Sequence, residues 1–147
     1  MVQLREITKD NLDDVVKLEV SESQEGFVAS TTYALAQAWV YKETAFPFAI
    51  YADDVLVGFI MLGYYEIKNQ YTIWKFLIDK HYQNKGYGRK ALELEVEYLI
   101  EKFNVSEVFV GVVISNNAAR NLYCSLGFRE TGEEDGRLLE MKLEICN

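Results

Sequence analysis

The chain has 147 residues, half of them hydrophobic and 14% aromatic, which suits one folded domain and argues against disorder. Its 15 lysines and arginines against 23 aspartates and glutamates leave a net charge of −8, which disfavours nucleic acid and favours small cationic ligands. No apolar run is long enough to cross a membrane and the first residues lack a signal-peptide pattern, so we expect a cytoplasmic protein.

The two cysteines and the single histidine give no sign of a metal or hydrolase site. Cys124 and Cys146 form neither a disulfide framework nor a metal-ligand spacing, and Cys124 is expected to pack as a small apolar residue within a helix. His81 has no cluster of partners around it and is most simply a loop residue. We therefore predict no metal in this protein.

The first forty residues predict one strand and two helices. Leu4 and Ile7 belong to a short strand, and Asp10 is well suited to cap the helix that follows. A second helix is predicted over residues 31–41, because apolar residues recur there at helical spacing. The residues expected on its buried side are Ala34, Leu35, Ala38 and Trp39.

The middle of the chain predicts four strands and one long helix. Residues 48–51 and 55–65 have the pattern of a hairpin, and the second run is almost continuously apolar, which suits a strand covered on both faces. A strand over 71–79 leads into a long amphipathic helix over 89–103, and 108–114 form another apolar strand. Because a strand–helix–strand crossover joins parallel strands, 71–79 and 108–114 should run parallel.

The end of the chain predicts a short helix and a hairpin. The helix covers 117–126, and Gly127 follows it at the position where glycine commonly ends a helix. The hairpin turns at Asp135-Gly136, and its last strand alternates apolar residues inward with charged residues outward. The inward residues are Leu139, Met141, Leu143 and Ile145. With no repeat or linker between these elements, residues 1–147 are predicted to form a single mixed α/β domain.

A segment with two glycines, Gln83-Asn84-Lys85-Gly86-Tyr87-Gly88, stands between the strand over 71–79 and the long helix. Glycines two residues apart allow a tight turn and let backbone N–H groups approach a ligand closely. The start of the helix adds unpaired N–H groups and the positive end of its dipole, and Arg89 adds a donor for phosphate. The segment therefore suits a pyrophosphate. The same pattern also fits a simple tight turn between strand and helix.

Two motifs resemble those of the GNAT superfamily of N-acetyltransferases. The first is the spacing Gln-x-x-Gly-x-Gly that begins at Gln83, which resembles the family's acyl-CoA pyrophosphate loop. The second is Asn116-x-x-Ala119-x-x-Leu122-Tyr123-x-x-x-Gly127-Phe128. The predicted order of elements also resembles this family over essentially the whole chain. The resemblance implies a central mixed seven-stranded sheet with about four helices, in which the parallel fourth and fifth strands splay apart.

The resemblance implies acetyl-CoA as the cofactor, bound where the two parallel strands separate. The gap would lie between Phe76-Leu77-Ile78 and Val112-Val113-Ile114, and pantetheine would add to the sheet edge there. An N–H near Leu77 would bind the thioester oxygen, so Leu77 is a predicted catalytic residue, and Asn116 would hydrogen-bond the cofactor. The residues expected to bind acetyl-CoA are Phe76, Leu77, Ile78, Gln83, Asn84, Lys85, Gly86, Tyr87, Gly88, Arg89, Asn116, Ala119 and Tyr123.

By the same resemblance, Tyr123 is the predicted general acid that protonates the departing thiolate of coenzyme A. A phenol with a pKa of about 10 remains protonated at neutral pH and is able to donate. Tyr123 also shares a helical face with Ala119 and Leu122, which is the pattern of a core residue. No base is evident in the sequence. Some amine-acetylating relatives place a carboxylate in the fourth strand, but this chain has Thr72-Ile73-Trp74-Lys75 there, without a carboxylate.

The predicted acceptor site lies in the connection between the first two helices, which usually sets acceptor specificity in this superfamily. Glu19, Glu22 and Glu25 are spaced by three residues, and carboxylates placed in this way attract a flexible cation. The aromatic residues expected to contact the acceptor are Phe27, Trp39 and Trp74. The same acidic spacing also fits the solvated end of a helix.

Residues 24–28, 36–39 and 74–79 resemble the bacterial diamine and spermidine N-acetyltransferase branch. This resemblance implies a polyamine such as spermidine or spermine as the acceptor, acetylated by direct attack of its primary amine. Other acceptors, an aminoglycoside or a protein or peptide, remain alternatives, as does an acyl-CoA-binding module without turnover. No nucleic-acid or membrane partner is expected. Members of the family are often dimers, which leaves a homodimer open.

Overall fold

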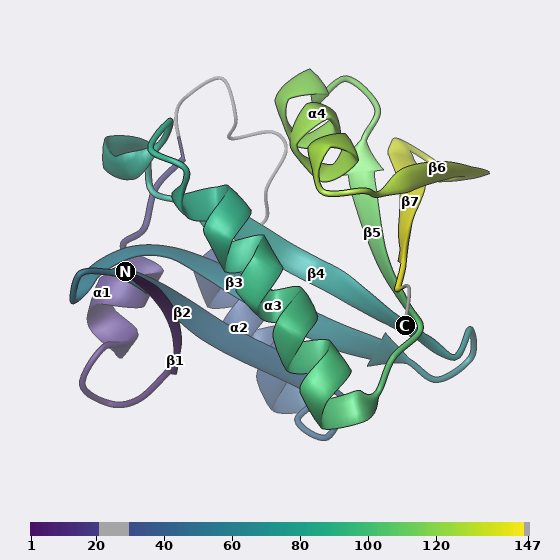
Figure 1. The fold of residues 1–147 in the computed structure, drawn as a ribbon. Helices are drawn as coiled ribbons and strands as arrows, with labels where there is room; N and C mark the ends of the chain where they lie inside the picture. Colours follow the sequence, from purple (N-terminus) through teal and green to yellow (C-terminus); the bar gives the residue numbers. More distant parts are fainter. Residues whose placement is uncertain (21–29, 146–147) are drawn as a thin grey trace.

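The computed structural model describes residues 1–20 and 30–145. In chain order the elements are β1 (Val2–Glu6), α1 (Leu12–Val16), α2 (Thr31–Val40), β2 (Ala45–Ala52), β3 (Val55–Tyr65), β4 (Gln70–Ile78), the 3-10 helix η2 (Lys80–Tyr82), α3 (Tyr87–Phe103), β5 (Glu107–Val113), α4 (Asn117–Ser125), β6 (Arg129–Asp135) and β7 (Leu138–Glu144). These strands form one seven-stranded sheet in the order β1-β2-β3-β4-β5-β7-β6 (Figure 1). Neighbours are antiparallel except β4 and β5, which run parallel as predicted.

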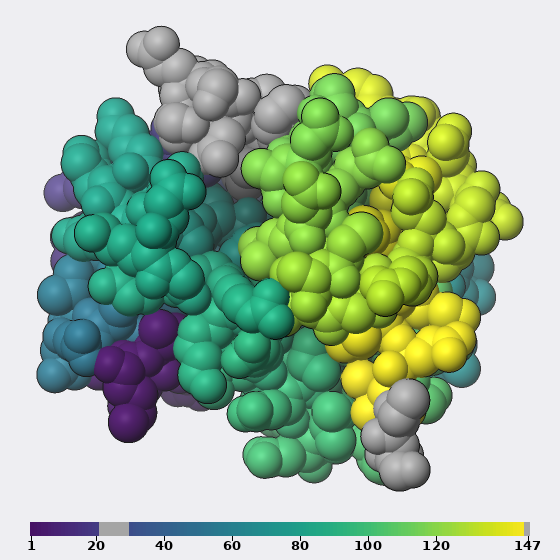
Figure 2. All heavy atoms as spheres, turned by 45° about the horizontal axis from the view of Figure 1, so that its top comes forward, coloured from purple at the N-terminus to yellow at the C-terminus, as the bar shows by residue number. Residues whose placement is uncertain are grey.

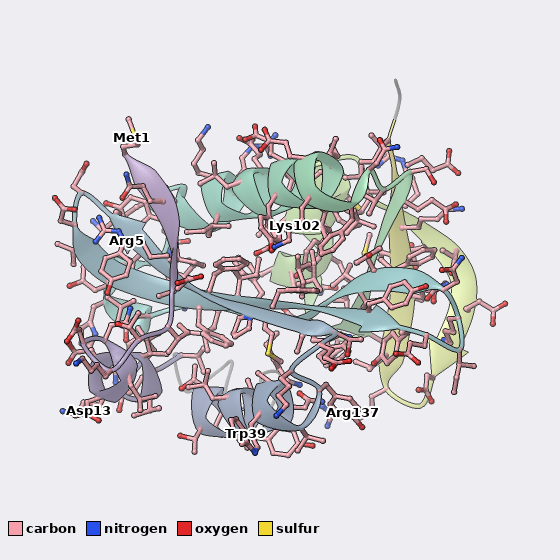
Figure 3. The ribbon with its side chains drawn as sticks, turned by 90° about the horizontal axis from the view of Figure 1, so that it is seen from below. Met1, Arg5, Asp13, Trp39, Lys102 and Arg137 are labelled. Carbon is pink, nitrogen blue, oxygen red and sulfur yellow. The ribbon has the colours of Figure 1, made fainter. Side chains whose placement is uncertain are left out.

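Helices cover both faces of the sheet. α3 and α4 lie on one face, and α1 and α2 lie on the other (Figures 1 and 3). The buried cluster under α3 and α4 includes Ile60 and Leu92, whereas the cluster under α1 and α2 includes Phe59 and Val15. Successive side chains of a strand point to opposite faces, so β3 contributes to both clusters. Its nearly continuous apolar sequence follows from this double coverage.

β4 contains a bulge and then separates from β5. Opposite β3 the register shifts by one residue, which leaves Trp74 without a partner. Pairing between β4 and β5 is confined to Thr72 with Phe109 and Ile73 with Val110, directly before the bulge. A bulge bends its strand and increases its twist. The parallel strands therefore diverge beyond Ile73, which confirms the predicted splayed pair.

Two local predictions are wrong. The capping position of α1 is held by Asn11, and Asp10 precedes it in a turn. Cys124 is exposed on α4, because it lies one residue, or about 100° of helix rotation, beyond the buried Tyr123. Across residues 1–20 and 30–145 no helix is long and apolar enough to cross a membrane.

The predicted burial of Trp39 is also wrong. Its side chain is 73% exposed and lies on the outer side of α2, away from the sheet (Figure 3). Trp39 follows the buried Ala34 by five residues, which places it about 140° around the helix. Lys42 Nζ covers its ring instead, at 4.7 Å from the ring centroid.

Candidate active site

The predicted pyrophosphate segment forms the connection between β4 and α3. After η2, Asn84 and Gly86 adopt left-handed backbone angles, with φ of 63° and 83°. Gly86 occupies the N-cap position of α3, and the first helical bond runs from the Lys90 N–H to the Gly86 carbonyl at 3.2 Å. The N–H groups of residues 87–89 therefore have no partner within the helix, which is what an anion site at a helix N-terminus requires.

The buried carboxylate of Asp79 fixes the start of this connection. Oδ2 accepts the Glu19 N–H at 3.0 Å, and Oδ1 accepts the His81 N–H at 2.9 Å and lies 2.7 Å from His81 Nδ1. Burial raises the pKa of Asp79, but the hydrogen bonds from Glu19 and His81 outweigh it, and the pKa lies below its ordinary value. Asp79 therefore joins the segment after α1 to the loop as a charged anchor.

Gly88 allows close contact between α3 and β4. A β-carbon at this position would lie 3.1 Å from Phe76 Cζ and 3.4 Å from Ile78 Cγ1. Gly86 has open space around it and is required instead for its backbone angle. One glycine thus turns the chain, and the other brings the N-terminus of α3 against the strand that borders the gap.

A cavity of about 310 Å³ opens beside this loop, between β4, α3 and α4. Figure 2 shows a hollow between the segment around residues 80–90 and α4. Most residues predicted to bind acetyl-CoA line this donor cavity: Phe76, Leu77, Ile78, Gln83, Asn84, Gly86, Tyr87, Gly88, Arg89, Asn116 and Ala119. Lys85 does not line it. Tyr82 and Leu122 line it without having been predicted; Leu122 is part of the second motif, whereas no pattern marks Tyr82.

The gap between β4 and β5 forms a second cavity, of about 190 Å³. Phe76, Asn116 and Ala119 line both this gap cavity and the donor cavity, so the two adjoin. Tyr123 lines the gap cavity from α4. The structure therefore brings the residues of both sequence motifs together around the point where the parallel strands separate.

The register of β3 and β4 decides which N–H groups face the gap. The Asp79 N–H donates to the Val57 carbonyl at 2.8 Å, and the same register pairs Leu77 with Phe59. Because hydrogen-bonded positions alternate along an antiparallel pair, the Leu77 N–H points to β3 and the Phe76 N–H points to the gap. The prediction of Leu77 as the donor thus disagrees with the register.

Three of the predicted side chains have partners within the protein. Gln83 Nε2 donates to the carbonyl of Ile78 at 2.9 Å. Arg89 Nη1 donates to Ser125 Oγ at 2.7 Å, which joins the start of α3 to the end of α4. Asn116 caps α4, since its Oδ1 accepts the N–H three residues later at 3.2 Å. These contacts fix the walls of the donor cavity.

Tyr123 is 5% exposed and packs edge-on against Phe128, with the ring centroids 5.3 Å apart. Burial raises the pKa of its hydroxyl, because the ionised form loses hydration. The hydroxyl therefore keeps its proton at neutral pH. The ring belongs to the core, as one of the two interpretations from sequence expected, and the same residue lines the gap cavity.

A third cavity, of about 400 Å³, lies on the α2 face of the sheet. It adjoins the gap cavity, because Ile73, Lys75 and Gly111 line both. The β6–β7 hairpin forms its outer wall. The hairpin residues that line it with carboxylates are Glu133, Glu134, Asp135 and Glu140, and we call it the acidic cavity. Donor cavity, gap cavity and acidic cavity thus follow one another across the sheet.

The predicted acceptor residues are only partly found at this cavity. Trp74 lines it. Glu19 is an exposed residue that pairs with Lys80 at 3.0 Å, and neither it nor Trp39 lines any of the three cavities. Glu22, Glu25 and Phe27 lie outside the described residues. The hairpin carboxylates were missed, although the run Glu133-Glu134-Asp135 beside the predicted turn was a visible signal.

Comparison with known proteins gives a consistent result. Residues 12–128 match the model of the Acetyltransferase (GNAT) family. The chain is 32% identical over 142 residues to spermine/spermidine N(1)-acetyltransferase from Bacillus subtilis strain 168, covering 91% of each chain. Its identity to the probable spermine N(1)-acetyltransferase of Bacillus subtilis subsp. natto is 33%, with the same coverage. The crystal structure of spermidine N-acetyltransferase from Vibrio cholerae with CoA and spermine has a TM-score of 0.77 at 19% identity, over 97% of this chain and 95% of that one.

The splayed sheet and the glycine loop define the class of protein: an N-acetyltransferase that uses acetyl-CoA. The chain belongs to the GNAT family, as its two motifs predicted. The residues present fit this donor, which supplies the acetyl thioester when bound. The N–H groups of residues 87–89, which have no partner within the helix, suit its pyrophosphate, and the diverging β4 and β5 leave room for an extended chain between them.

Proposed function

We propose that the protein transfers an acetyl group from acetyl-CoA to a primary amine of a polyamine such as spermidine or spermine. The observation that carries this proposal is the acidic cavity, which meets the gap on the side opposite the donor cavity. A net charge of −8 also steers cations toward the protein. The Bacillus relatives are named for spermine and spermidine, which supports the same acceptor class.

In the proposed reaction the neutral amine attacks directly, without an acyl-enzyme. Its nitrogen forms a bond to the acetyl carbon, the bond from that carbon to sulfur breaks, and the thiolate leaves with the proton of Tyr123. The proton that the amine nitrogen loses passes to solvent, from which the Tyr123 hydroxyl is restored. The Phe76 N–H faces the gap and is placed to donate to the acetyl oxygen as negative charge develops there. Phe76 takes the role that the sequence assigned to Leu77.

Tyr123 is the proposed acid that protonates the departing thiolate. Burial raises the pKa of its hydroxyl, and the same surroundings raise the pKa of a thiol buried beside it. The two groups therefore remain close enough in acidity for efficient proton transfer. Packing of the ring against Phe128 holds the hydroxyl in place. The core role and the acid role of Tyr123 are compatible in this arrangement.

The test is release of CoA from acetyl-CoA with spermidine, spermine, putrescine, an aminoglycoside and a peptide with a free N-terminus. We expect turnover on the polyamines, and we expect Tyr123→Phe to lower kcat at least tenfold, or about 1.4 kcal/mol of barrier. Tyr98→Phe is a matched control, because Tyr98 packs in the same cluster on α3 but lines none of the three cavities. The Kd for acetyl-CoA should be similar in all three proteins.

Preferential turnover of the aminoglycoside or the peptide would refute the polyamine assignment and leave the acetyltransferase intact. A kcat for Tyr123→Phe equal to that of the wild type would return Tyr123 to a purely structural role. Binding of acetyl-CoA with no turnover on any amine would refute catalysis on these acceptors altogether.

A further inference from the structure

We propose that the acidic cavity binds an acceptor with two or more amino groups in one orientation. The distal ammonium lies at the β6–β7 hairpin, and the amine to be acetylated lies beside Lys75 at the gap. This inference rests on the amine-acetylating function proposed above and specifies which end of the acceptor enters the gap. It also makes an oligoamine a better ligand than a monoamine of similar size.

Positive and negative side chains occupy different ends of this cavity. The four hairpin carboxylates line the acidic cavity, but none of them lines the gap cavity. Lys75 lines both cavities, and no other charged residue among those described does so. Lys68 lines the acidic cavity alone. The cavity therefore has a positive charge where it meets the gap and an excess of negative charge at the hairpin, which orients a cation by Coulomb forces.

Buried polar atoms without a partner lie at the same cavity and point to a polar ligand. Within residues 1–20 and 30–145 there are five such side-chain atoms. Three of them, Gln37 Oε1, Thr72 Oγ1 and Trp74 Nε1, belong to residues that line the acidic cavity, and the other two are the oxygens of Glu95 on α3. Thr72 is only 9% exposed, and a buried polar atom without a hydrogen-bond partner is costly because it has lost its hydration. Gln37 Oε1 and Thr72 Oγ1 are acceptors, which match the N–H donors of an oligoamine.

The acidic cavity also offers aromatic faces, and one of them, Tyr65, lines this cavity but not the gap cavity. Tyr65 and Trp74 line the acidic cavity with their ring centroids 5.5 Å apart and their planes tilted by 49°. Burial raises the pKa of Tyr65, and the negative charge of Asp135 raises it further, which shows that this carboxylate lies near the phenol. An ammonium held here gains Coulomb attraction from Asp135 and cation–π attraction from the rings.

Lys75 disfavours a second ammonium at the gap. Its Nζ lies 5.9 Å from the ring centroid of Tyr33 on α2, and in the described part of the chain it forms no ion pair. Burial lowers the pKa of Lys75. Because like charges repel, an amine that lies beside Lys75 is favoured in its neutral form, which is the form that attacks. Among the described residues, the other titratable groups that line these two cavities or lie against Lys75 are Tyr33, Tyr65, Lys68, Tyr123 and the hairpin carboxylates.

Calorimetric titration of spermidine and butylamine into the CoA-loaded protein tests the hairpin end without requiring turnover. We expect spermidine to bind at least tenfold more tightly than butylamine. The triple variant Glu133→Gln, Glu134→Gln, Asp135→Asn should reduce that ratio to below threefold with butylamine affinity nearly unchanged. Glu130→Gln is the matched control, because Glu130 lies on the same strand outside the acidic cavity and should leave the ratio as it is.

The pH profile of kcat/KM for spermidine tests the gap end. Lys75→Met should shift the rising limb to higher pH by half a unit or more, because the attacking amine loses its positive neighbour. Lys75→Arg keeps the charge and should follow the wild type. A shift seen equally in both variants, or in neither, overturns the role of Lys75.

The two proposals fail separately in these experiments. An unchanged spermidine-to-butylamine ratio in the triple variant overturns the hairpin subsite, even if spermidine is acetylated. Another outcome is that the wild type prefers spermidine to butylamine in binding, the triple variant loses that preference, and no amine is acetylated. That result supports the hairpin subsite and refutes the acetylation proposed above. Equal affinity of the wild type for both amines overturns the oriented binding directly.

Discussion

Replacing Glu95 with glutamine should remove a dependence of stability on pH that a buried carboxylate imposes. Glu95 is 0% exposed and lies with Ala91, Leu92 and Leu99 on the buried face of α3. Within the described residues neither of its oxygens has a hydrogen-bond partner. Burial raises the pKa of Glu95 from 4.5 to about 8. Glu95→Gln keeps the size and polarity of the side chain but cannot ionise.

The sign of the effect follows from the two pKa values. In the folded protein Glu95 holds its proton up to about pH 8, whereas in the unfolded chain it ionises near pH 4.5. The contribution of Glu95 to stability is therefore most favourable below pH 4.5 and declines as the pH rises toward 8, where the loss is complete. At 1.36 kcal/mol per pH unit, the loss over this whole range is about 5 kcal/mol. That is a large part of the roughly 5–15 kcal/mol that is typical of a folded domain.

Urea unfolding at pH 5.5, 6.5 and 7.5 measures this loss. The wild type should lose roughly 1.4 kcal/mol per pH unit more than Glu95→Gln over this interval. Carboxylates whose pKa is lowered, such as Asp79, do not contribute to this change, because they titrate at lower pH. Glu97→Gln is the control, because Glu97 is exposed on the same helix. Parallel stability curves for the wild type and Glu95→Gln would refute a neutral Glu95 in the folded protein.

Two further predictions concern the loop that borders the donor cavity. Gly88→Ala places a β-carbon 3.1 Å from Phe76 Cζ, at the wall of the donor cavity. It should raise the Kd for acetyl-CoA severalfold, which titration calorimetry can measure. The Tm in a melting curve should stay within a few degrees of the wild type. Asp79→Asn removes the charged acceptor of the Glu19 and His81 N–H groups, and it should cost about 1–3 kcal/mol of unfolding free energy. Because the pKa of Asp79 is lowered, its contribution is present above pH 3.8 and is lost at lower pH, so the two proteins should converge in stability on acidification.

The cofactor side of the site was predictable because short local patterns encode it. Gly86 and Gly88 have different tasks, a left-handed angle and a close contact, but both require glycine and so both appear in the sequence. Asn116 similarly marks the start of α4, because a side-chain cap must be contiguous with its helix. These features depend on a few neighbouring residues, so their spacing, together with the resemblance to GNAT proteins, pointed to the region of the donor cavity.

Burial at single positions was harder to predict. Glu95 falls on the apolar stripe of α3 at helical spacing from Ala91 and Leu99, but a carboxylate in a sequence gives no local sign that it will be buried. Whether a carboxylate on such a stripe is buried depends on how the helix sits on the sheet, which no local pattern gives. The acidic cavity was missed for a related reason: it forms only when the β6–β7 hairpin lies opposite α2 and β4.

The bulge at Trp74 accounts for the one misassigned donor and also connects the two sides of the site. Ile73 and Phe76 pack in the same cluster under α3 and α4 although three positions separate them, which an unbroken strand cannot do. The extra residue moves Phe76 to the donor side, moves Leu77 to the α2 side, and directs the Phe76 N–H into the gap. Strict alternation along an unbroken β4 gives the opposite assignment, and the family resemblance from which Leu77 was predicted does not reveal a bulge in this chain. The bulge also leaves Trp74 and Lys75 as consecutive residues at the acidic cavity, so one inserted residue sets the divergence from β5, the N–H that faces the gap and two of the side chains that line the acidic cavity.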